Sequence, residues 1–213
     1  RTIDRVARRE VFLASGDLYS RTDVKDSKNA LKRTSYFEDV EIKEERLSKN
    51  TMDLVVNVKE AATGSIGGGI GYGSSDGLLL SANLSDSNIF GSGLKAGIDV
   101  ERSDRELNGG ISLSNPRLFD SIYSLSGRLY ATDLDNYYYD NKKYGLNIVL
   151  GRKLGRHWGA SLGYILEKSE LDVSATDYPA LYALKDVIWT PDVLKSAIVP
   201  GISFNNTDDF YLP

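Results

Sequence analysis

The residues best suited to a specific interaction lie in the glycine-rich stretch Gly64 to Ser75, and the chemistry they offer is backbone hydrogen bonding. Read with period two, the stretch is a strand with glycines at 67, 69, 71 and 73 on one face. Each glycine in a strand interior costs roughly 0.5 to 1 kcal/mol relative to alanine. We therefore predict a strand that pairs weakly for its length, with an opposite face made of Ile66, Gly68, Ile70 and Tyr72.

The stretch does not read as a phosphate-binding loop, because no Lys-Ser or Lys-Thr pair follows it and no helix starts there. His157 is the single histidine of the chain, which argues against a catalytic triad and against a metal site. No serine lies in a Gly-x-Ser-x-Gly elbow, and the acidic pairs Glu44-Glu45 and Asp208-Asp209 are expected to be solvated or to face a lumen. We expect no catalytic residues, no metal and no cofactor.

Composition narrows the class of protein. The 213 residues carry a formal net charge of -4, which argues against a nucleic-acid partner held by phosphate contacts. There is no cysteine and no run of about 18 apolar residues. A mean hydropathy of -0.30 is still compatible with a transmembrane β-barrel, whose strands hide their lipid-facing residues at every second position. Because the chain opens at Arg1 directly into a helical pattern, we expect its true N-terminus to lie upstream.

The first 60 residues predict the order helix, helix, strand, strand. Thr2 is the expected N-cap of a short helix with a stripe of Ile3, Val6, Ala7 and Val11. A second helix is expected from Ser20 or Thr22 to about Lys32, with buried positions at Val24, Ala30 and Leu31. Alternating apolar residues then predict two strands, one around Val40 and Ile42 and one from Met52 to Val58.

Beyond Ala61 the helical period disappears, and strands of about ten residues follow one another, each with one apolar and one small or polar face. Together with the glycine-rich strand they number about eight. The apolar sets are Leu80, Ala82, Leu84; Leu94, Ala96, Ile98, Val100; Ile111, Leu113; Tyr123, Leu125, Leu129, Ala131; Tyr144, Leu146, Ile148, Leu150; Trp158, Ala160, Leu162, Tyr164, Leu166; and Ile198, Ile202, Phe204.

These strands are longer than those of a soluble β-sandwich, and their opposite faces carry glycine, serine, asparagine and charges such as Lys95, Glu101 and Arg128. Aromatic residues collect near the strand ends, as two membrane interfaces require. They are Tyr72, Phe90, Phe119, Tyr123, Tyr144, Trp158 and Tyr164. The pattern favours a membrane barrel over a soluble sandwich, with an extracellular loop at about residues 171–194 that has a short helical possibility from Ala180 to Asp186.

Several of these residues, in this order, resemble one family. They are Arg8-Arg9-Glu10, Gly16-Asp17, Tyr36-Phe37, Lys59-Glu60, Thr63-Gly64, the run Gly69 to Gly73, Asn88 to Gly93, Ser114-Asn115-Pro116 and Asn206-Thr207-Asp208. The chain is similar to the junction of the last POTRA domain and the barrel in the BamA family of outer-membrane assembly proteins. The resemblance implies an incomplete α+β POTRA module at residues 1–62, followed by antiparallel transmembrane β-barrel strands at 63–213, the N-terminal half of a larger barrel.

The resemblance also implies a function and partners. The function is folding and insertion of β-barrel proteins into the bacterial outer membrane, with the POTRA part in the periplasm. The partners are outer-membrane lipids, unfolded outer-membrane proteins and assembly lipoproteins such as BamD. Weak pairing of the first barrel strand then indicates a lateral gate that pairs with substrate strands. Its residues are Ile66, Gly67, Gly68, Gly69, Ile70, Gly71, Tyr72 and Gly73.

Three alternatives stay open at this stage. The glycines of the first strand could serve only to fill a crowded lumen corner or to permit curvature. The chain could belong to a two-partner secretion or TamA-like translocator of the same superfamily, or to a passive pore. Arg5, Arg8 and Arg9 could bind a partner lipoprotein or anionic headgroups, although a solvated helix face is the simpler expectation. The family's first POTRA strand and its inward-pointing Arg-Gly-Phe motif are both missing here.

Overall fold

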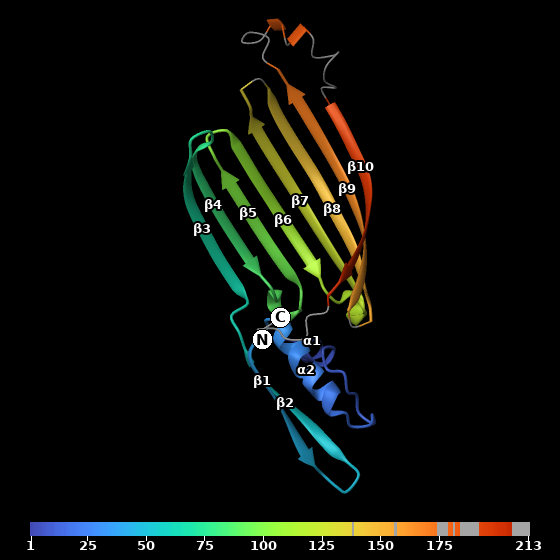
Figure 1. The fold of residues 1–213 in the computed structure, drawn as a ribbon. Coiled ribbons are helices and arrows are strands. Elements are labelled where there is room, and N and C mark those ends of the chain that lie inside the picture. Colours follow the sequence, from blue (N-terminus) through green and yellow to red (C-terminus); the bar gives the residue numbers. More distant parts are fainter. Residues whose placement is uncertain (138, 156, 174–178, 181, 184–191, 206–213) are drawn as a thin grey trace. The chain divides into compact units, whose positions relative to one another are not determined.

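The computed structural model describes all residues except 138, 156, 174–178, 181, 184–191 and 206–213 (Figure 1). The chain divides into two compact units. Among the described residues, the first holds residues 1–64, the segment 86–94 and Asn205, and the second lies within residues 65–85 and 95–204.

The first unit contains two helices and a hairpin in the predicted order. Helices α1 (Asp4–Arg8) and α2 (Arg21–Arg33) precede strands β1 (Phe37–Arg46) and β2 (Met52–Glu60), which pair antiparallel. The buried core of this unit draws on both helices and β1, and half-buried Ala7, Val11 and Val56 pack against it. Its members are Val6, Leu31, Tyr36, Phe37 and Val40.

The helix caps confirm one prediction and correct another. Ser20 is the N-cap of α2, and its Oγ accepts a hydrogen bond from the backbone N–H of Asp23 at 3.2 Å. Thr2 is not the N-cap of α1, since that position is Ile3 and has no side-chain cap. The Thr2 hydroxyl instead accepts a hydrogen bond from the Asn88 side chain at 2.8 Å.

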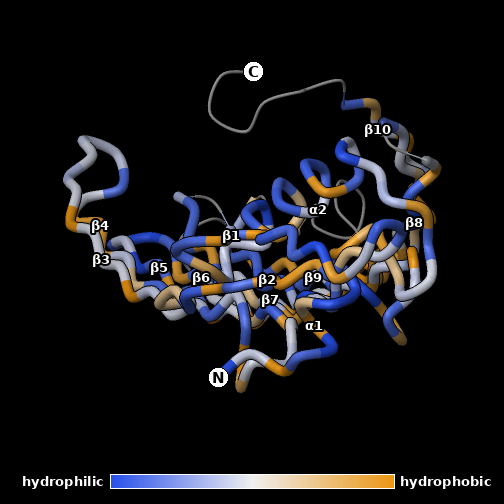
Figure 2. The backbone as a smooth tube through the Cα atoms, turned by 90° about the horizontal axis from the view of Figure 1, so that it is seen from below, coloured by the Kyte–Doolittle hydropathy of each residue, from blue (hydrophilic) through white to orange (hydrophobic). Residues whose placement is uncertain are grey.

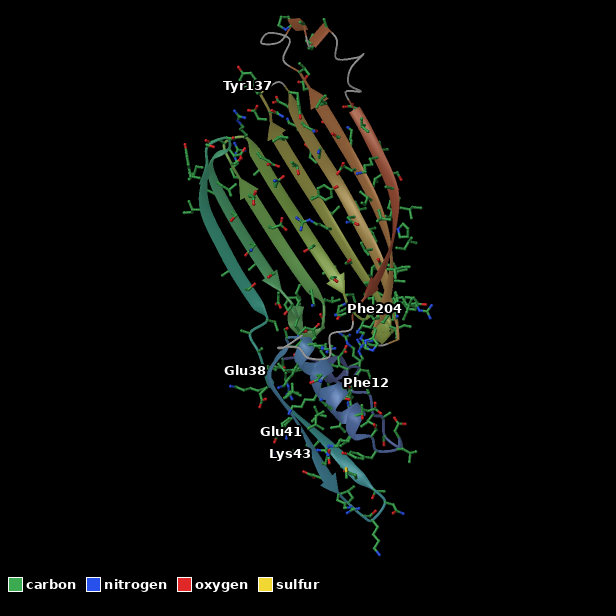
Figure 3. The ribbon with its side chains drawn as sticks, in the orientation of Figure 1. Phe12, Glu38, Glu41, Lys43, Tyr137 and Phe204 are labelled. Atoms are coloured by element: carbon green, nitrogen blue, oxygen red, sulfur yellow. The ribbon has the colours of Figure 1, made fainter. Side chains whose placement is uncertain are left out.

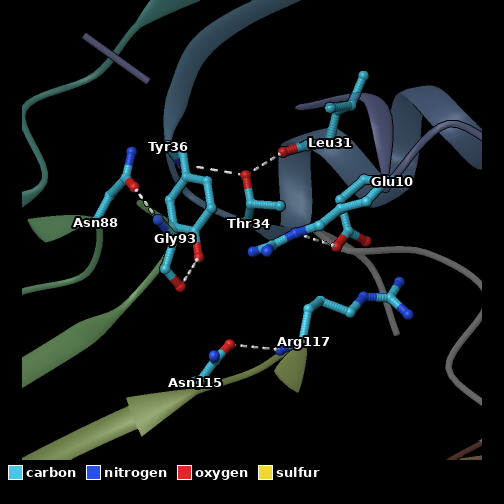
Figure 4. Close-up of polar contacts among 9 residues, drawn as sticks. Glu10, Leu31, Thr34, Tyr36, Asn88, Gly93, Asn115 and Arg117 are labelled. Carbon is cyan, nitrogen blue, oxygen red and sulfur yellow. Dashed lines mark hydrogen bonds and ion pairs between the residues drawn. The ribbon is translucent and has the colours of Figure 1, made fainter. Parts of the chain in front are cut away.

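The segment between the second and third strands of the large sheet folds with the first unit. Ile3 donates its N–H to the carbonyl of Gly91 at 3.0 Å, and the Tyr36 hydroxyl donates to the carbonyl of Gly93 at 3.2 Å (Figure 4). The side chain of Asn88 accepts the N–H of Gly93 at 2.7 Å. Gly93 has φ +74, and a Cβ there would collide with the guanidinium of Arg9, so both backbone and space require glycine.

The second unit is an antiparallel sheet of eight strands in the linear order β10-β9-β8-β7-β6-β5-β4-β3 (Figure 1). Short 3₁₀ turns, η1 (Ile89–Gly91) and η2 (Leu118–Asp120), precede β5 and β7. The strands are β3 (Gly64–Gly73), β4 (Gly77–Asp86), β5 (Lys95–Arg102), β6 (Glu106–Asn115), β7 (Tyr123–Asp135), β8 (Asp140–Leu154), β9 (Trp158–Asp172) and β10 (Asp192–Phe204). The predicted number of strands is therefore confirmed.

Hydrophobic and hydrophilic residues alternate along these strands, as the colouring of the backbone shows (Figure 2). The predicted apolar face is largely uncovered: Ile66, Ile70 and Tyr72 are 85%, 81% and 82% exposed. Exposed leucines and isoleucines continue this face across the sheet, among them Leu84, Ile98, Leu113, Leu129 and Leu162. Tyr137, between β7 and β8, and Phe204, at the end of β10, lie at opposite ends of the strands (Figure 3).

The predicted loop at about 171–194 and its possible helix lie mostly outside the described residues. Across the part of the chain that is described, no helix is long and apolar enough to span a membrane.

Candidate functional site

The first strand of the sheet, β3, has an open edge. Strand β3 is the last member of the linear strand order, so within the described residues only β4 pairs with it. The edge presents the backbone N–H and C=O groups of a ten-residue strand. Every residue predicted for the gate, Ile66 to Gly73, lies in this strand.

Two of the four glycines on the bare face of β3 are crowded by side chains of β4, which would have to shift to admit a Cβ. A Cβ at Gly67 would lie 2.5 Å from Oδ1 of Asn83, and one at Gly69 would lie 2.8 Å from Oγ of Ser81. These polar side chains therefore lie over the bare backbone of β3, on the face opposite Ile66, Ile70 and Tyr72. The contacts depend on strand register, so no sequence pattern identifies Asn83 and Ser81 in this role.

The other two glycines of this face, Gly71 and Gly73, are not crowded in this way. A Cβ at Gly71 would lie 3.6 Å from Leu79, and one at Gly73 would lie 3.7 Å from Asp76, which are ordinary van der Waals contacts. Neither residue has a positive φ. Alanine therefore fits at both positions, and the absence of a side chain there is not explained by space or by backbone conformation. At the start of the strand, the Ser65 and Ser85 hydroxyls are hydrogen bonded at 2.8 Å and tie β3 to β4.

On the same polar face, one row of residues crosses five strands. Cα partners run from Asp99 on β5 through Gly110, Tyr130 and Gly145 to Glu167 on β9. The two glycines leave room for longer side chains, because a Cβ at Gly110 would collide with Arg128 and one at Gly145 would collide with Tyr130.

From the central strand β7, two side chains use this room to reach acids two strands away. Arg128 lies over Gly110 and donates both guanidinium N–H groups to Asp99, at 2.8 and 2.7 Å. Tyr130 lies over Gly145 and donates its hydroxyl to Glu167 at 2.6 Å. Arg128 thus pairs with Asp99, and the two contacts together brace β5 to β9.

His157, the single histidine of the chain, lies beside aromatic residues. The ring of His157 lies 6.2 Å from Phe204, which stacks on Trp158 at 4.8 Å between ring centroids. No group of three or more acidic, histidine or cysteine residues that could hold a metal occurs among the described residues.

The expectation of a solvated arginine face on α1 is wrong for Arg9. Arg8 is exposed and pairs with Asp4 at 2.6 Å, but Arg9 and Glu10 form an ion pair at 3.7 Å whose side chains are only 9% and 12% exposed. The reason is that Arg9 packs over Gly93, where the missing side chain makes space for it.

Comparison with known proteins decides the family. The Omp85 superfamily domain matches residues 88–213, more than half of the chain. The chain belongs to the Omp85 superfamily. Residues 1–61 match a second family, the POTRA domain described as a surface antigen variable number repeat. The α+β start and the antiparallel strands of this Omp85 chain are thus a POTRA-like module followed by barrel strands.

Several curated relatives of this Omp85 chain are named outer membrane protein assembly factor BamA. The chain is 33% identical over 171 residues to the outer membrane protein assembly factor BamA of Buchnera aphidicola, covering 76% of this chain and 28% of the relative. The BamA of Neorickettsia risticii is 25% identical over 216 residues, covering 100% and 29%. The chain therefore spans less than a third of the length of these curated relatives.

A solved structure agrees with this assignment. The crystal structure of BamA from Haemophilus ducreyi lacking POTRA domains 1–3 superimposes with a TM-score of 0.73 at 26% identity. The match covers 100% of this chain and 43% of that one. The POTRA-like module and the barrel strands follow one another along this chain in the same order as in a BamA chain.

Proposed function

We propose that this chain is the part of an outer-membrane protein assembly factor that offers β3 as a pairing edge to the strands of unfolded outer-membrane proteins. The module at residues 1–62 lies in the periplasm in this proposal, and an assembly lipoprotein such as BamD is its partner. The strands from residue 63 onward cross the outer membrane and contact its lipids. The process is strand exchange and needs no catalytic group.

The physical reason lies in the cost of an unpaired strand edge. In hydrocarbon, each unsatisfied backbone group costs several kcal/mol, so an inserting strand needs a partner throughout insertion. An edge strand that opens readily supplies this partner by β-augmentation, with main-chain hydrogen bonds that accept many sequences. Exposed Ile66, Ile70 and Tyr72 on the outward face of β3 keep the paired strands in contact with lipid.

The observation that carries the proposal is the pair Gly71 and Gly73. Crowding by Asn83 and Ser81 accounts for Gly67 and Gly69, but nothing around Gly71 and Gly73 excludes a methyl group. Glycine at these two positions raises the entropy of the unpaired strand without serving the packing of the paired one. This is the property that a strand needs if it must leave and rejoin its partners.

The test is the rate at which the intact protein, reconstituted in liposomes, assembles an unfolded barrel protein. Gly71→Ala and Gly73→Ala should each stabilise the paired strand by about 0.4 to 1 kcal/mol and slow assembly. Gly127→Ala is the matched control, since Gly127 on β7 also has room for a methyl group but has paired strands on both sides. Equal rates for the β3 variants and the control would overturn the role of weak pairing.

A disulfide tests the edge itself. Cysteines placed on β3 and on the strand that faces its open edge in the intact barrel should, once oxidised, block assembly, and reduction should restore it. Assembly at the normal rate in the oxidised state would exclude β3 as the pairing edge. It would then favour a translocator or a passive pore, for which passage through the lumen is sufficient.

A further inference from the structure

The turn that follows β3 is attached to the turn of the next hairpin. Residues 74–76 connect β3 to β4, and residues 103–105 connect β5 to β6. Both connections belong to the second unit and lie at the same end of its sheet (Figure 1). The backbone N–H of Asp104 donates to the carbonyl of Asp76 at 3.1 Å. This hydrogen bond joins the two hairpins directly at their turns.

The side chain of Asp104 adds a second contact, because it lies over Gly77, the first residue of β4. A Cβ at Gly77 would collide with the Asp104 carboxylate, and Gly77 has φ +67, which residues with side chains rarely adopt. Space and backbone conformation therefore both require glycine at this position. Asp104 is itself an exposed residue, so core packing does not explain where its side chain lies.

The turn that carries Asp104 is firmly held. Ser103 is only 5% exposed, and its N–H donates to the carbonyl of Glu106 at 2.7 Å. Its hydroxyl accepts the N–H groups of Arg105 at 3.3 Å and of Glu106 at 2.9 Å. The carbonyl of Arg105 in turn accepts the N–H of Asp135 on β7 at 2.7 Å. The turn at 103–105 is thus fixed both internally and to β7, and it offers the turn at 74–76 a rigid support.

Such a support matters because β3 specifies its own register weakly. In a glycine-rich strand, few side chains distinguish one pairing from the next, so the strand is prone to slip along its neighbour. Gly71 and Gly73, the two residues without crowded surroundings, lie at the end of β3 nearest to the turn. A slip of β3 along β4 changes the number of residues in the turn between them. A contact that fixes this turn from outside the hairpin therefore opposes the slip.

We propose that Asp104 is a positioning residue for β3, which holds the turn at 74–76 so that the strand opens and re-forms without changing its register. Each incoming strand then meets the same row of backbone donors and acceptors. This inference rests on the proposed role of β3 as a pairing edge, and it names the residue that keeps the edge in place.

A pair of cysteines measures the register. Ser65 and Ser85, whose hydroxyls are 2.8 Å apart across β3 and β4, are both replaced by cysteine in the intact protein in liposomes. This chain has no cysteine of its own, and any cysteine elsewhere in the protein is removed. In the native register, the pair should form a disulfide rapidly under mild oxidation. Gly77→Ala forces the two turns apart, and disulfide formation should slow by about fivefold or more.

Gly155→Ala is the matched control for a general loss of stability. Gly155 also has a positive φ, +79, but a Cβ there meets nothing within 4 Å. Alanine at this position strains the backbone without a collision, and the disulfide between positions 65 and 85 should form at the wild-type rate. If both variants slowed it equally, the contact with Asp104 would not be the cause, and the proposal would be wrong.

A second substitution separates the contact from the strain of the turn itself. In Gly77→Ala combined with Asp104→Gly, the collision is removed while the positive φ of residue 77 remains. Glycine at 104 keeps the N–H that bonds to Asp76, so the double variant should recover most of the disulfide rate. Asp104→Asn keeps the shape of the side chain and should behave as wild type. A double variant as slow as Gly77→Ala alone would show that Asp104 does not hold the turn.

Assembly rates of the same proteins distinguish this proposal from the pairing edge. Gly71→Ala and Gly77→Ala should both slow assembly, the first by strengthening β3 and the second by misaligning it. If Gly71→Ala slowed assembly and Gly77→Ala left disulfide formation unchanged, β3 would be the pairing edge and Asp104 would not position it. If Gly77→Ala slowed disulfide formation and neither variant slowed assembly, the effect of Asp104 on register would stand and the pairing edge would fail.

Discussion

At the scale of single residues, the unpredicted feature is how glycine and long polar side chains share the polar face of the sheet. Arg128 and Tyr130 cross Gly110 and Gly145 to reach Asp99 and Glu167. Alternation along each strand predicts that these residues lie on one face. Their partners follow only from the register between strands, which the sequence does not reveal because many registers preserve the alternation.

Breaking the bidentate pair should weaken the sheet. Asp99→Asn leaves Arg128 with one neutral acceptor, and because both side chains are 43% exposed, we expect a loss of about 1 kcal/mol. The measurement is the urea midpoint of the intact protein in liposomes. Glu170→Gln is the control, since its partner Lys168 lies on the same strand, and it should change the midpoint less. Equal effects would contradict a bracing role for Arg128.

Ser27 is a buried residue that the amphipathic pattern of α2 does not identify. Its hydroxyl accepts the N–H of Phe12 at 2.8 Å and donates to the carbonyl of Asp23 at 2.6 Å. The predicted buried positions include Leu31, which is confirmed, but Val24 and Ala30 are only half-buried. A serine satisfied by backbone groups is as buried as a leucine, which hydrophobicity alone does not predict.

Ser27→Ala should therefore destabilise the first unit. The substitution leaves the N–H of Phe12 without its acceptor in a partly buried position, at a cost of about 1 kcal/mol. Hydrogen exchange of the α2 amides in the intact protein measures this loss. Thr22→Ala, at an exposed position on the same helix, should stay within about 0.5 kcal/mol of wild type. Similar exchange in both variants would show that Ser27 is dispensable.

At the scale of elements, the strands and most of their connections were predictable, but the unit to which one connection belongs was not. Period-two alternation identifies each barrel strand, and glycine or proline punctuation identifies most connections. The attachment of residues 86–94 to the first unit depends on contacts between distant parts of the chain, such as that of Tyr36 with Gly93. No local pattern encodes such a contact.

The contact of Tyr36 should make the first unit sensitive to alkali. Burial raises the pKa of the Tyr36 phenol, the nearby Arg9 lowers it and Glu10 raises it. Because the folded pKa is raised, the stabilisation is complete below the unfolded value of about 10 and is lost as the pH rises through the folded pKa. Tyr36→Phe should cost about 1 kcal/mol at neutral pH and remove this alkaline loss.

Urea midpoints of wild type and Tyr36→Phe measure the difference when compared between pH 8 and pH 11, roughly 2 units below and 1 unit above the ordinary pKa of the phenol. The gap between the two proteins should narrow as the pH rises. Tyr19→Phe serves as a control, because the Tyr19 hydroxyl is hydrogen bonded to Glu44 at an exposed site and should contribute less at neutral pH. A gap that stays constant with pH would show that Tyr36 does not titrate with unfolding.

At the scale of the whole molecule, the sheet combines a braced part with an open edge. Strands β5 to β9 are joined by full registers and by the contacts of Arg128 and Tyr130. Strand β3 has one partner among the described residues and two glycines that packing does not require. The family, the order of elements and the weak pairing of the first strand were predictable from the sequence, but the bracing of β5 to β9 was not, because it depends on strand register.

The contrast predicts where the intact protein opens. In liposomes, the amides of β3 should exchange with solvent deuterium at least about tenfold faster than those of β7, a difference of roughly 1.4 kcal/mol in opening free energy.

The double variant Gly71→Ala, Gly73→Ala should slow exchange in β3 and leave β7 unchanged, since only the unpaired β3 loses backbone freedom. Asp99→Asn should do the reverse and speed exchange in β5 to β7 without affecting β3. If β3 exchanged as slowly as β7, the glycine-rich edge would not be weak. The proposed strand exchange would then need a partner protein or substrate to open the closed barrel.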